Sequence, residues 1–316
     1  MISLESVSKR YGSKTVVDDL SFTVKEGEIV GFLGPNGAGK TTTLRMISGY
    51  ITPTAGRVQV AGFDMATENT IAAQKIGYLP ELPPLYDTLS VVGYLRFVAK
   101  AKGVSRSAIM GELDRVSVAC RLEAVFRQEV FKLSKGYRQR LGLAQALIGK
   151  PDVLLLDEPT NGLDPGQIQE TREVIRSFGK EHTVLLSTHI LSEVTRICQR
   201  VAIINEGRLL TIDTPSGLQR AAEETNRIVL KVTGETQHLR NELLSLNGLR
   251  EVKIEKPDAR GMSVIECDVD ERDGIDADIA RTVTTNWSLH PLERRQPTLE
   301  NIFLRYVRET PEGSHS

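Results

Sequence analysis

The sequence has few cysteines, and they are not clustered. Its 316 residues include three, Cys120, Cys198 and Cys267, which lie far apart in the chain. A small odd number of widely spaced cysteines indicates neither a disulfide framework nor a zinc cluster. We therefore expect buried free thiols in a protein of a reducing compartment.

Aromatic residues and surplus charge are also scarce. Aromatic side chains make up 5% of the residues, which is low for a surface that stacks nucleic-acid bases, and the formal net charge is -1. Domains that bind nucleic acid usually carry an excess of positive charge, which attracts the phosphates. These two shortages argue against a nucleic-acid partner.

Long hydrophobic runs are missing as well. No apolar run approaches the roughly 20 residues that a membrane-spanning helix needs. Even Val153–Leu156, one of the most apolar stretches, is far too short. Residues 1–5 lack the basic and then apolar segments of a signal peptide. The sequence predicts a soluble, cytoplasmic protein that reaches a membrane only through a partner.

The first part of the chain alternates strand patterns with helical patterns. Compact apolar runs such as Ile29–Leu33 and Thr183–Ser187 are typical of buried strands. From about residue 83 to residue 150, apolar residues recur at helical spacing instead. Pro215-Ser216-Gly217 indicates a boundary that a short helix bridges. We expect an α/β domain over residues 1–215 with a helical subdomain at about 83–150.

A second pattern fills residues 216–310. It predicts the order strand, helix, strand, strand, helix, strand, which is a ferredoxin-like α+β arrangement. A final amphipathic helix would follow, and residues 311–316 look like a disordered tail. The expected strands and helices are Ile228–Val232, Thr236–Leu246, Val252–Glu255, Met262–Val269, Ile275–Thr285 and Trp287–Leu292, and the final helix would carry Leu299, Ile302, Phe303, Tyr306 and Val307 on one face.

Gly34 to Thr41 fits the pattern G-x-x-x-x-G-K-[ST] of a phosphate-binding loop. Glycines let consecutive backbone N–H groups turn toward phosphate oxygens, and a helix predicted at Thr41–Ser48 adds its positive N-terminal end. Lys40 would reach the β- and γ-phosphates, and the Thr41 hydroxyl would ligate Mg²⁺. A strand precedes the loop and a helix follows it, a context that a chance glycine-rich turn lacks.

Two acids follow the buried strand pattern Val153–Leu156. Asp157 is suited to hold Mg²⁺ through water, and Glu158 is suited to orient and deprotonate an attacking water. Surface acids often follow a strand, so the pair alone would be weak evidence. Together with the phosphate loop it indicates a nucleotide-hydrolysing site.

Ser134, in Leu133-Ser134-Lys135-Gly136-Tyr137-Arg138-Gln139, precedes a predicted helix. As a purely structural residue it would serve as that helix's N-cap. Its position shortly before Asp157 matches the ABC signature, and at this point the chain resembles the ABC ATPase family. The resemblance covers residues 2–215 strongly and 216–310 weakly. It implies a P-loop NTPase fold, ATP as the substrate and Mg²⁺ as the cofactor.

In that family two subunits enclose two ATP molecules head to tail. The signature serine and glycine of one subunit then complete the γ-phosphate site of the other, a role that the resemblance gives to Ser134 and Gly136. It implies a dimer, either of identical subunits or with a paralogue, and poor hydrolysis by a monomer. The implied ATP-binding residues are Tyr11, Gly34, Pro35, Asn36, Gly37, Ala38, Gly39, Lys40, Thr41, Thr42, Ser134, Lys135, Gly136 and Asp164.

Three further positions take roles from the resemblance. Tyr11 stands where an aromatic ring stacks on adenine, although it could be an ordinary surface tyrosine. Asp164, in Asn161-Gly162-Leu163-Asp164, matches the loop that links the two sites, although it could be a turn residue. His189 matches the switch histidine that contacts the γ-phosphate. The implied catalytic residues are Glu158, His189 and Lys40, and the implied metal ligands are Thr41, Asp157 and Glu81.

Two positions depart from the family pattern. Glu81 replaces the usual glutamine that couples Mg²⁺ and the attacking water to the membrane partner. A carboxylate can still ligate Mg²⁺, but it adds negative charge beside the γ-phosphate. Lys135 replaces a signature glycine; it would bring a cation near the partner's nucleotide or would be a solvated lysine.

These departures resemble the branch of ABC-2-type exporters, which includes sodium, drug and gliding-motility ATPases. The ending Pro297–Phe303 also resembles that branch. The resemblance implies separate integral membrane permease subunits and a location on the inner face of the plasma membrane. The second domain could regulate, could reinforce the dimer or could shield the ATPase domain.

Two other functions compete with transport. A non-transport ABC ATPase acting on nucleic acid or ribosomes would carry long coiled coils or two ATPase domains, and this sequence contains one phosphate loop and no sustained heptads. A different phosphate-loop enzyme, such as a kinase, would lack the Ser134 signature and His189.

Overall fold

The computed structural model describes residues 1–179, 181–223, 226–234, 236, 238–258, 261–270 and 274–295. The chain divides into two compact units, of which the first is Met1–Pro215 and the second begins at Ser216. No helix of the described ranges is long and apolar enough to cross a membrane. The expected final helix at residues 299–307 and the tail at 311–316 lie outside the described residues.

The first unit contains a twisted antiparallel sheet of order β2-β1-β4-β5. Its strands alternate buried apolar residues with exposed ones, as in β2, where Leu20, Phe22 and Val24 are buried and the residues between them are exposed. One face of this sheet is therefore apolar. The strands are β1 (Ile2–Tyr11), β2 (Lys14–Val24), β4 (Ala55–Val60) and β5 (Phe63–Asp64).

The second sheet of this unit has six strands in the order β10-β9-β3-β8-β7-β6. All neighbours from β9 to β6 are parallel, and only β10 pairs antiparallel, with β9. The central strands are buried on both faces, which explains their unbroken apolar sequences. The strands are β3 (Ile29–Leu33), β6 (Ile76–Leu79), β7 (Val153–Asp157), β8 (Thr183–Thr188), β9 (Arg200–Asn205) and β10 (Arg208–Asp213).

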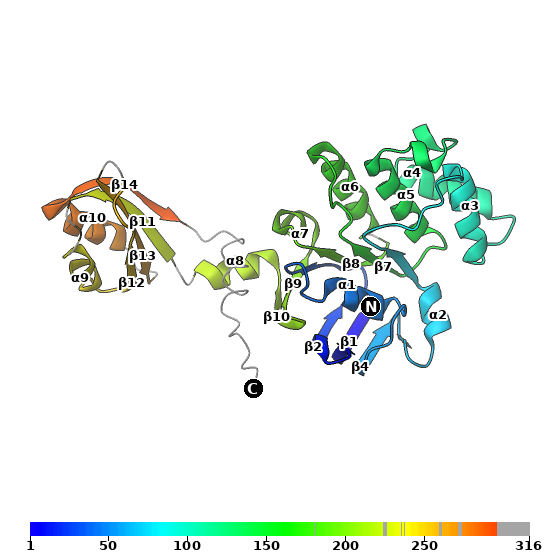
Figure 1. The fold of residues 1–316 in the computed structure, drawn as a ribbon, viewed down its shortest axis with the longest axis horizontal. Helices are drawn as coiled ribbons and strands as arrows, with labels where there is room; N and C mark the ends of the chain where they lie inside the picture. The colour runs from blue at the N-terminus through cyan, green and yellow to red at the C-terminus, as the bar shows by residue number, and fades with distance from the viewer. Residues whose placement is uncertain are drawn as a thin grey trace. The chain divides into compact units, whose positions relative to one another are not determined.

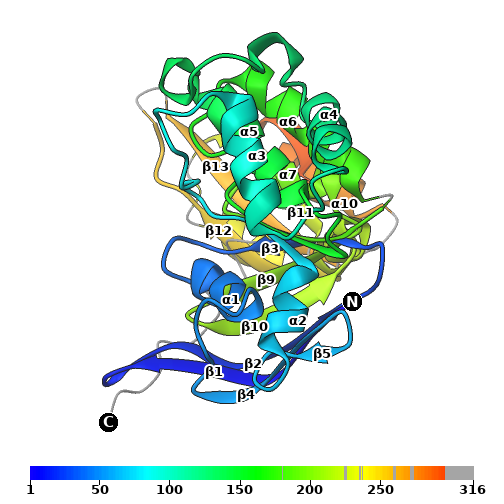
Figure 2. The ribbon, with the colours of Figure 1, turned by 90° about the vertical axis from the view of Figure 1, so that its right-hand side faces the viewer.

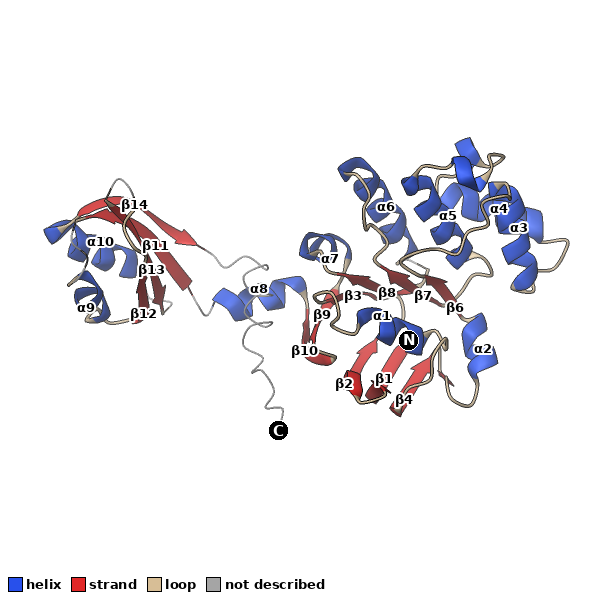
Figure 3. Ribbon diagram, in the orientation of Figure 1, coloured by secondary structure: helices blue, strands red, loops and turns tan. Residues whose placement is uncertain are grey.

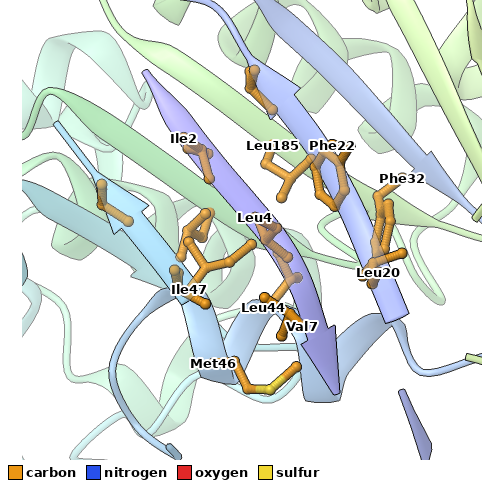
Figure 4. Packing of buried hydrophobic residues seen from close by; sticks show 14 of the residues in the cluster. Ile2, Leu4, Val7, Leu20, Phe22, Phe32, Leu44, Met46, Ile47 and Leu185 are labelled. Carbon is orange, nitrogen blue, oxygen red and sulfur yellow. The ribbon is translucent and has the colours of Figure 1, made fainter. Parts of the chain in front are cut away.

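Helix α1 (Lys40–Ile47) lies between the two sheets (Figure 1 and Figure 2). Its Leu44, Met46 and Ile47 join side chains of both sheets in one buried cluster (Figure 4). Because α1 starts at the end of β3, this core fixes the loop between them. The other helices of the six-stranded sheet are α2 (Asn69–Gln74), α6 (Pro165–Phe178) and α7 (Leu191–Ile197).

A group of helices follows β6, where the sequence predicts a helical subdomain. Helix α5 ends against two cations, which suits the negative end of its dipole. The Lys102 ammonium donates to the carbonyls of Gln145, Ala146 and Ile148 at 3.2, 3.1 and 2.8 Å, and Arg115 donates to Leu147 O at 2.8 Å. The elements are α3 (Val91–Ala101), α4 (Ile109–Ala119), two short 3₁₀ turns (Glu123–Val125 and Val130–Lys132) and α5 (Lys135–Leu147).

The second unit has the predicted order of strands and helices. Its four strands form an antiparallel sheet of order β12-β13-β11-β14, and α9 and α10 pack together on one face of it (Figure 3). Their buried side chains form a core separate from that of the first unit. The elements are α8 (Pro215–Glu223), β11 (Asn226–Thr233), α9 (Leu239–Leu244), β12 (Leu249–Ile254), β13 (Met262–Val269), α10 (Ile275–Asn286) and β14 (Ser288–Arg295).

Every helix and strand predicted in the described part of this unit, except Met262–Val269, differs from the prediction by one to three residues at one or both ends, α9 and β14 among them. Helix α9 starts later and ends earlier than the expected Thr236–Leu246. Its end at Leu244 is followed by a turn, in which the Leu246 N–H donates to Leu243 O at 3.0 Å and Gly248 has φ 98°. Strand β14 is longer than expected and continues through Pro291 to Arg295. Proline is tolerated there because β14 is an edge strand whose register with β11 shifts at this point.

Candidate active site

The glycine-rich loop between β3 and α1 has room only for glycine at two positions. A side chain at Gly34 would place its Cβ 2.5 Å from the Ile204 carbonyl oxygen, and one at Gly39 would lie 2.9 Å from the Val16 carbonyl oxygen. Gly39 also has φ 98°, a conformation that L-residues rarely adopt. The loop is therefore packed tightly against the neighbouring strands, and these contacts fix its backbone conformation.

A cavity of about 490 Å³ opens at this loop. It lies at the carboxyl ends of parallel strands, where open α/β sheets usually bind ligands. The cavity brings together the glycine-rich loop, Glu81, Glu158 after β7 and His189 after β8. Its lining residues are Val16, Asn36, Gly37, Gly39, Lys40, Thr41, Thr42, Glu81, Glu158, Asn161 and His189.

Lys40 supplies a buried positive charge in this cavity. Its ammonium group donates hydrogen bonds to the carbonyls of Gly34 at 2.8 Å and Pro35 at 3.2 Å. It also lies 3.4 Å from Glu158 Oε1, and the Lys40 residue is only 6% exposed. The cation is thus held between the loop that would bind phosphates and the acid that would activate water.

Glu158 bridges Lys40 and His189. One carboxylate oxygen faces the lysine, and the other lies 2.9 Å from His189 Nδ1. The backbone at Glu158 has φ 47°, in the left-handed region, and its N–H donates to Ser187 O at 3.0 Å. A non-glycine residue in that region costs on the order of 1 kcal/mol and is often found at functional sites. This bend points the carboxylate into the cavity.

Asp157 has the properties expected of a metal ligand. It is fully buried, and neither carboxylate oxygen has a hydrogen-bond partner among the described residues. Burial raises the pKa of this carboxyl group; the nearby Thr41 and Ser187 hydroxyls oppose that rise, and the Glu81 charge adds to it. A cation beside Asp157 would compensate the buried charge.

The available oxygen donors fit Mg²⁺. This ion prefers hard oxygen ligands, often one or two carboxylates completed by waters and substrate phosphates. Asp157 and Thr41 supply a carboxylate and a hydroxyl close to each other. Thr41 and Glu81 line the cavity, whereas the buried Asp157 does not. No group of three or more His, Cys, Asp or Glu side chains suited to a metal occurs in the described part of the chain.

Glu81 is connected to the loop Asn161–Asp164. Its Oε1 accepts a hydrogen bond of 3.0 Å from Asn161 Nδ2. Asn161 belongs to the motif Asn161–Asp164, but no sequence pattern predicts that its side chain lines the cavity. The contact joins the predicted coupling position to the loop that the resemblance assigns to communication between two sites.

The signature residues lie outside this cavity. Ser134, Lys135 and Gly136 begin α5, and none of them is among the lining residues. The exposed Ser134 side chain caps the helix by accepting from the Tyr137 N–H at 3.4 Å. Ser134 and Lys135 are exposed, Gly136 is buried beside the Gln167 side chain, and none of the three contributes to its own subunit's cavity.

Lys135 crosses the loop Asn161–Asp164 of the same subunit. A Cβ added at Gly162 would lie 2.0 Å from Lys135 Nζ, so the ammonium group rests directly against this glycine. Asp164 at the end of the loop caps α6 by accepting from the Gln167 N–H at 2.9 Å. The contacts connect the signature segment and this loop within one subunit.

Tyr11 ends strand β1 and is 50% exposed. The Lys9 ammonium lies 5.3 Å from the centre of its ring, and Val16, on the following strand, lines the cavity. The ring is accessible to a flat ligand, but it is not among the lining residues.

Comparison with known proteins points to one family. The family model described as "ABC transporter" matches residues 17–161. An ABC transporter ATP-binding protein of Bacillus subtilis is 39% identical over 81% of this chain and 84% of its own length. The Nod factor export ATP-binding protein I of Paraburkholderia xenovorans is 36% identical over 96% of both chains. A bacterial ABC transporter cassette solved as a dimer has a TM-score of 0.62 at 25% identity, covering 68% of this chain and 98% of the cassette.

Proposed function

The chain belongs to the ABC transporter family as an ATP-binding, ATP-hydrolysing subunit, and we propose that it drives an exporter of the ABC-2 type. Support for export comes from the Paraburkholderia xenovorans relative, which matches both units of this chain and is named for Nod factor export. Both of these relatives are named as transport proteins, and their names give no support to a function on nucleic acid. What the exporter carries would be selected by separate permease subunits.

The proposed chemistry follows from the cavity. Loop N–H groups and Lys40 bind the β- and γ-phosphates. Thr41, Asp157 and Glu81 would hold Mg²⁺, which offsets negative charge on the phosphates. Glu158 accepts a proton from the water whose oxygen attacks the γ-phosphorus, while the bond from that phosphorus to the ADP oxygen breaks. His189 orients Glu158 through the 2.9 Å contact and faces the same space.

We further propose that a second subunit completes each site. The observation that carries this is the separation of motifs within one chain, since Ser134 and Lys135 are exposed at the N-terminus of α5 and none of the signature residues lines the cavity. A helix N-terminus favours bound anions, so Ser134 and Gly136 of one copy would bind the γ-phosphate held by the other.

A complementation experiment tests this arrangement. Lys40→Ala removes nucleotide binding from a subunit but leaves its Ser134, whereas Ser134→Arg blocks the signature but leaves the phosphate loop. Each variant alone should be inactive. A mixed dimer has one complete site, so mixing the two should restore hydrolysis. If the mixture is no more active than the sum of its parts, the shared site is wrong.

We propose that the permease contacts a surface beside Glu81, which would hold the subunit at the inner face of the plasma membrane. Leu82 is 84% exposed, and Tyr86 and Phe97 are also exposed with their rings 5.3 Å apart. A cluster of exposed apolar side chains often marks a protein contact.

Leu82→Asp should abolish co-purification with the permease and leave basal ATP hydrolysis unchanged. Val118→Asp alters another exposed apolar side chain, on α4, and serves as the control. Retention of the permease by Leu82→Asp would exclude this surface.

A further inference from the structure

Glu193 is a buried carboxylate that lies outside the cavity. It is in α7, just after the switch histidine, and only 1% of it is exposed. The Thr160 hydroxyl donates to its Oε1, and the Thr188 hydroxyl donates to its Oε2 at 2.9 Å. The two oxygens of one carboxylate thus connect two separate segments of the chain.

These two segments carry the reacting groups. Thr160 follows Glu158 by two positions, and Thr188 directly precedes His189. Thr188 Oγ1 also accepts from the Ile190 N–H at 3.0 Å, so its hydroxyl both donates and accepts at the turn that carries His189. Both threonines are buried, which leaves water little opportunity to replace the carboxylate.

Arg172 partly offsets the buried charge. Its Nη2 lies 3.9 Å from Glu193 Oε1, across the contact between α6 and α7. At that distance the pair attracts without a hydrogen bond. A buried carboxylate is costly unless it is hydrogen-bonded, and the two threonine hydroxyls supply hydrogen bonds to both of its oxygens.

We propose that Glu193 is a positioning residue that sets the distance between Glu158 and His189. It contacts neither ATP nor the attacking water. By holding Thr160 and Thr188 at one carboxylate, it fixes the ends of β7 and β8 so that His189 Nδ1 meets Glu158 Oε2. This inference rests on the proposed roles of Glu158 and His189 and adds the residue that aligns them.

The test compares kcat with KM for ATP. Glu193→Ala frees both hydroxyls, so it should lower kcat at least tenfold while KM and ATP affinity change less than about threefold, because the phosphate loop is untouched. Glu193→Gln keeps one accepting oxygen and should retain part of kcat. Thr188→Val should lower kcat in the same way, and Thr188→Ser, which keeps the hydroxyl, should restore it.

Glu28→Ala is the matched control. Glu28 is also a largely buried carboxylate, paired with Arg200 at 3.3 Å, but it precedes β3 at the end opposite the phosphate loop. It should lower thermal stability without a selective loss of kcat. Equal kcat losses in Glu28→Ala and Glu193→Ala, or a Thr188→Ser variant as impaired as Thr188→Val, would overturn the inference.

A failure of the proposed function would give a different experimental result from a failure of the Glu193 inference. If Glu158→Gln hydrolyses ATP normally, Glu158 is not the base, and there is no aligned pair to position. If Glu158→Gln is inactive and Glu193→Ala keeps normal kcat, the proposed function stands and only the role of Glu193 is wrong.

Discussion

Asn161 donates a 3.0 Å hydrogen bond to Glu81 across a sequence separation of 80 residues. Glu81 lies next to the expected permease surface, and Asn161 begins a loop that also contacts Lys135 at Gly162. A movement of the Glu81 side chain would therefore disturb Asn161, and a movement of Asn161 would disturb Glu81. Through Asn161 and Gly162, this bond connects Glu81 indirectly with Lys135, so the two positions that depart from the family pattern are joined by one loop.

Glu81→Gln should change the metal and pH dependence of hydrolysis. The Glu81 charge raises the pKa of Asp157, so its removal should lower that pKa and move the acid limb of the pH–rate profile to lower pH. Loss of an anionic oxygen should also raise the half-saturating Mg²⁺ concentration, by up to about tenfold. Steady-state rates across pH and Mg²⁺ concentration measure both effects.

Asn161→Ala is the control for this change, because it removes the hydrogen-bond donor and keeps the Glu81 charge, whereas Glu81→Gln removes the charge and keeps an oxygen that can accept the bond. It should leave the acid limb in place. Identical pH and metal profiles for wild type and Glu81→Gln would show that the charge is irrelevant.

Glu158→Gln should reduce hydrolysis at least about a hundredfold, because the amide cannot accept the proton of the attacking water. The amide still fits beside Lys40 and His189, so ATP binding should persist. Size-exclusion chromatography should then show a stable dimer only with ATP present. Normal turnover by this variant would remove Glu158 from the role of general base.

Gly162→Ala should lower the free energy of unfolding by about 1 to 2 kcal/mol, because alanine is strained at φ 67° and its Cβ would meet the Lys135 ammonium. Lys135→Ala removes the collision but not the strain. The double variant should therefore be more stable than the sum of the single changes implies. Urea unfolding of all four proteins gives this coupling energy, and strict additivity would mean that the exposed Lys135 side chain moves away from the new methyl group at no cost.

Lys102→Met should lower the free energy of unfolding by about 1 kcal/mol, since it removes the cation that binds three carbonyls at the end of α5. Lys100→Met changes an exposed lysine in the last turn of α3 and should have less effect. Urea unfolding midpoints compare the two. Equal losses would mean that the carbonyl contacts contribute nothing specific.

The phosphate loop and the acid pair could be predicted because each is a short contiguous pattern with its own strand or helix context. Gly34 to Thr41 follows β3 and opens α1, and Asp157-Glu158 ends β7. Their meeting in one cavity follows from parallel strands whose carboxyl ends share an edge. The sequence could therefore indicate this part of the site without coordinates.

The contacts between distant segments could not be predicted. Glu193 resembles any acid in a short helix until the packing of α6 and α7 buries it between Thr160 and Thr188. The bond between Glu81 and Asn161 likewise depends on how two loops approach in the folded chain. A signal was present for α6, where Asp164 and Pro165 form a typical N-cap and first helical residue.

The left-handed backbone at Glu158 also restricts which amino acids position 158 can hold. Valine, isoleucine and threonine are strongly disfavoured there by their branched side chains, whereas glycine, asparagine and aspartate adopt the conformation more readily. In a library randomised at this codon, inactive but well-folded clones should be rich in the second group and poor in the first. The position would thus be selected twice, once for its carboxylate and once for its backbone.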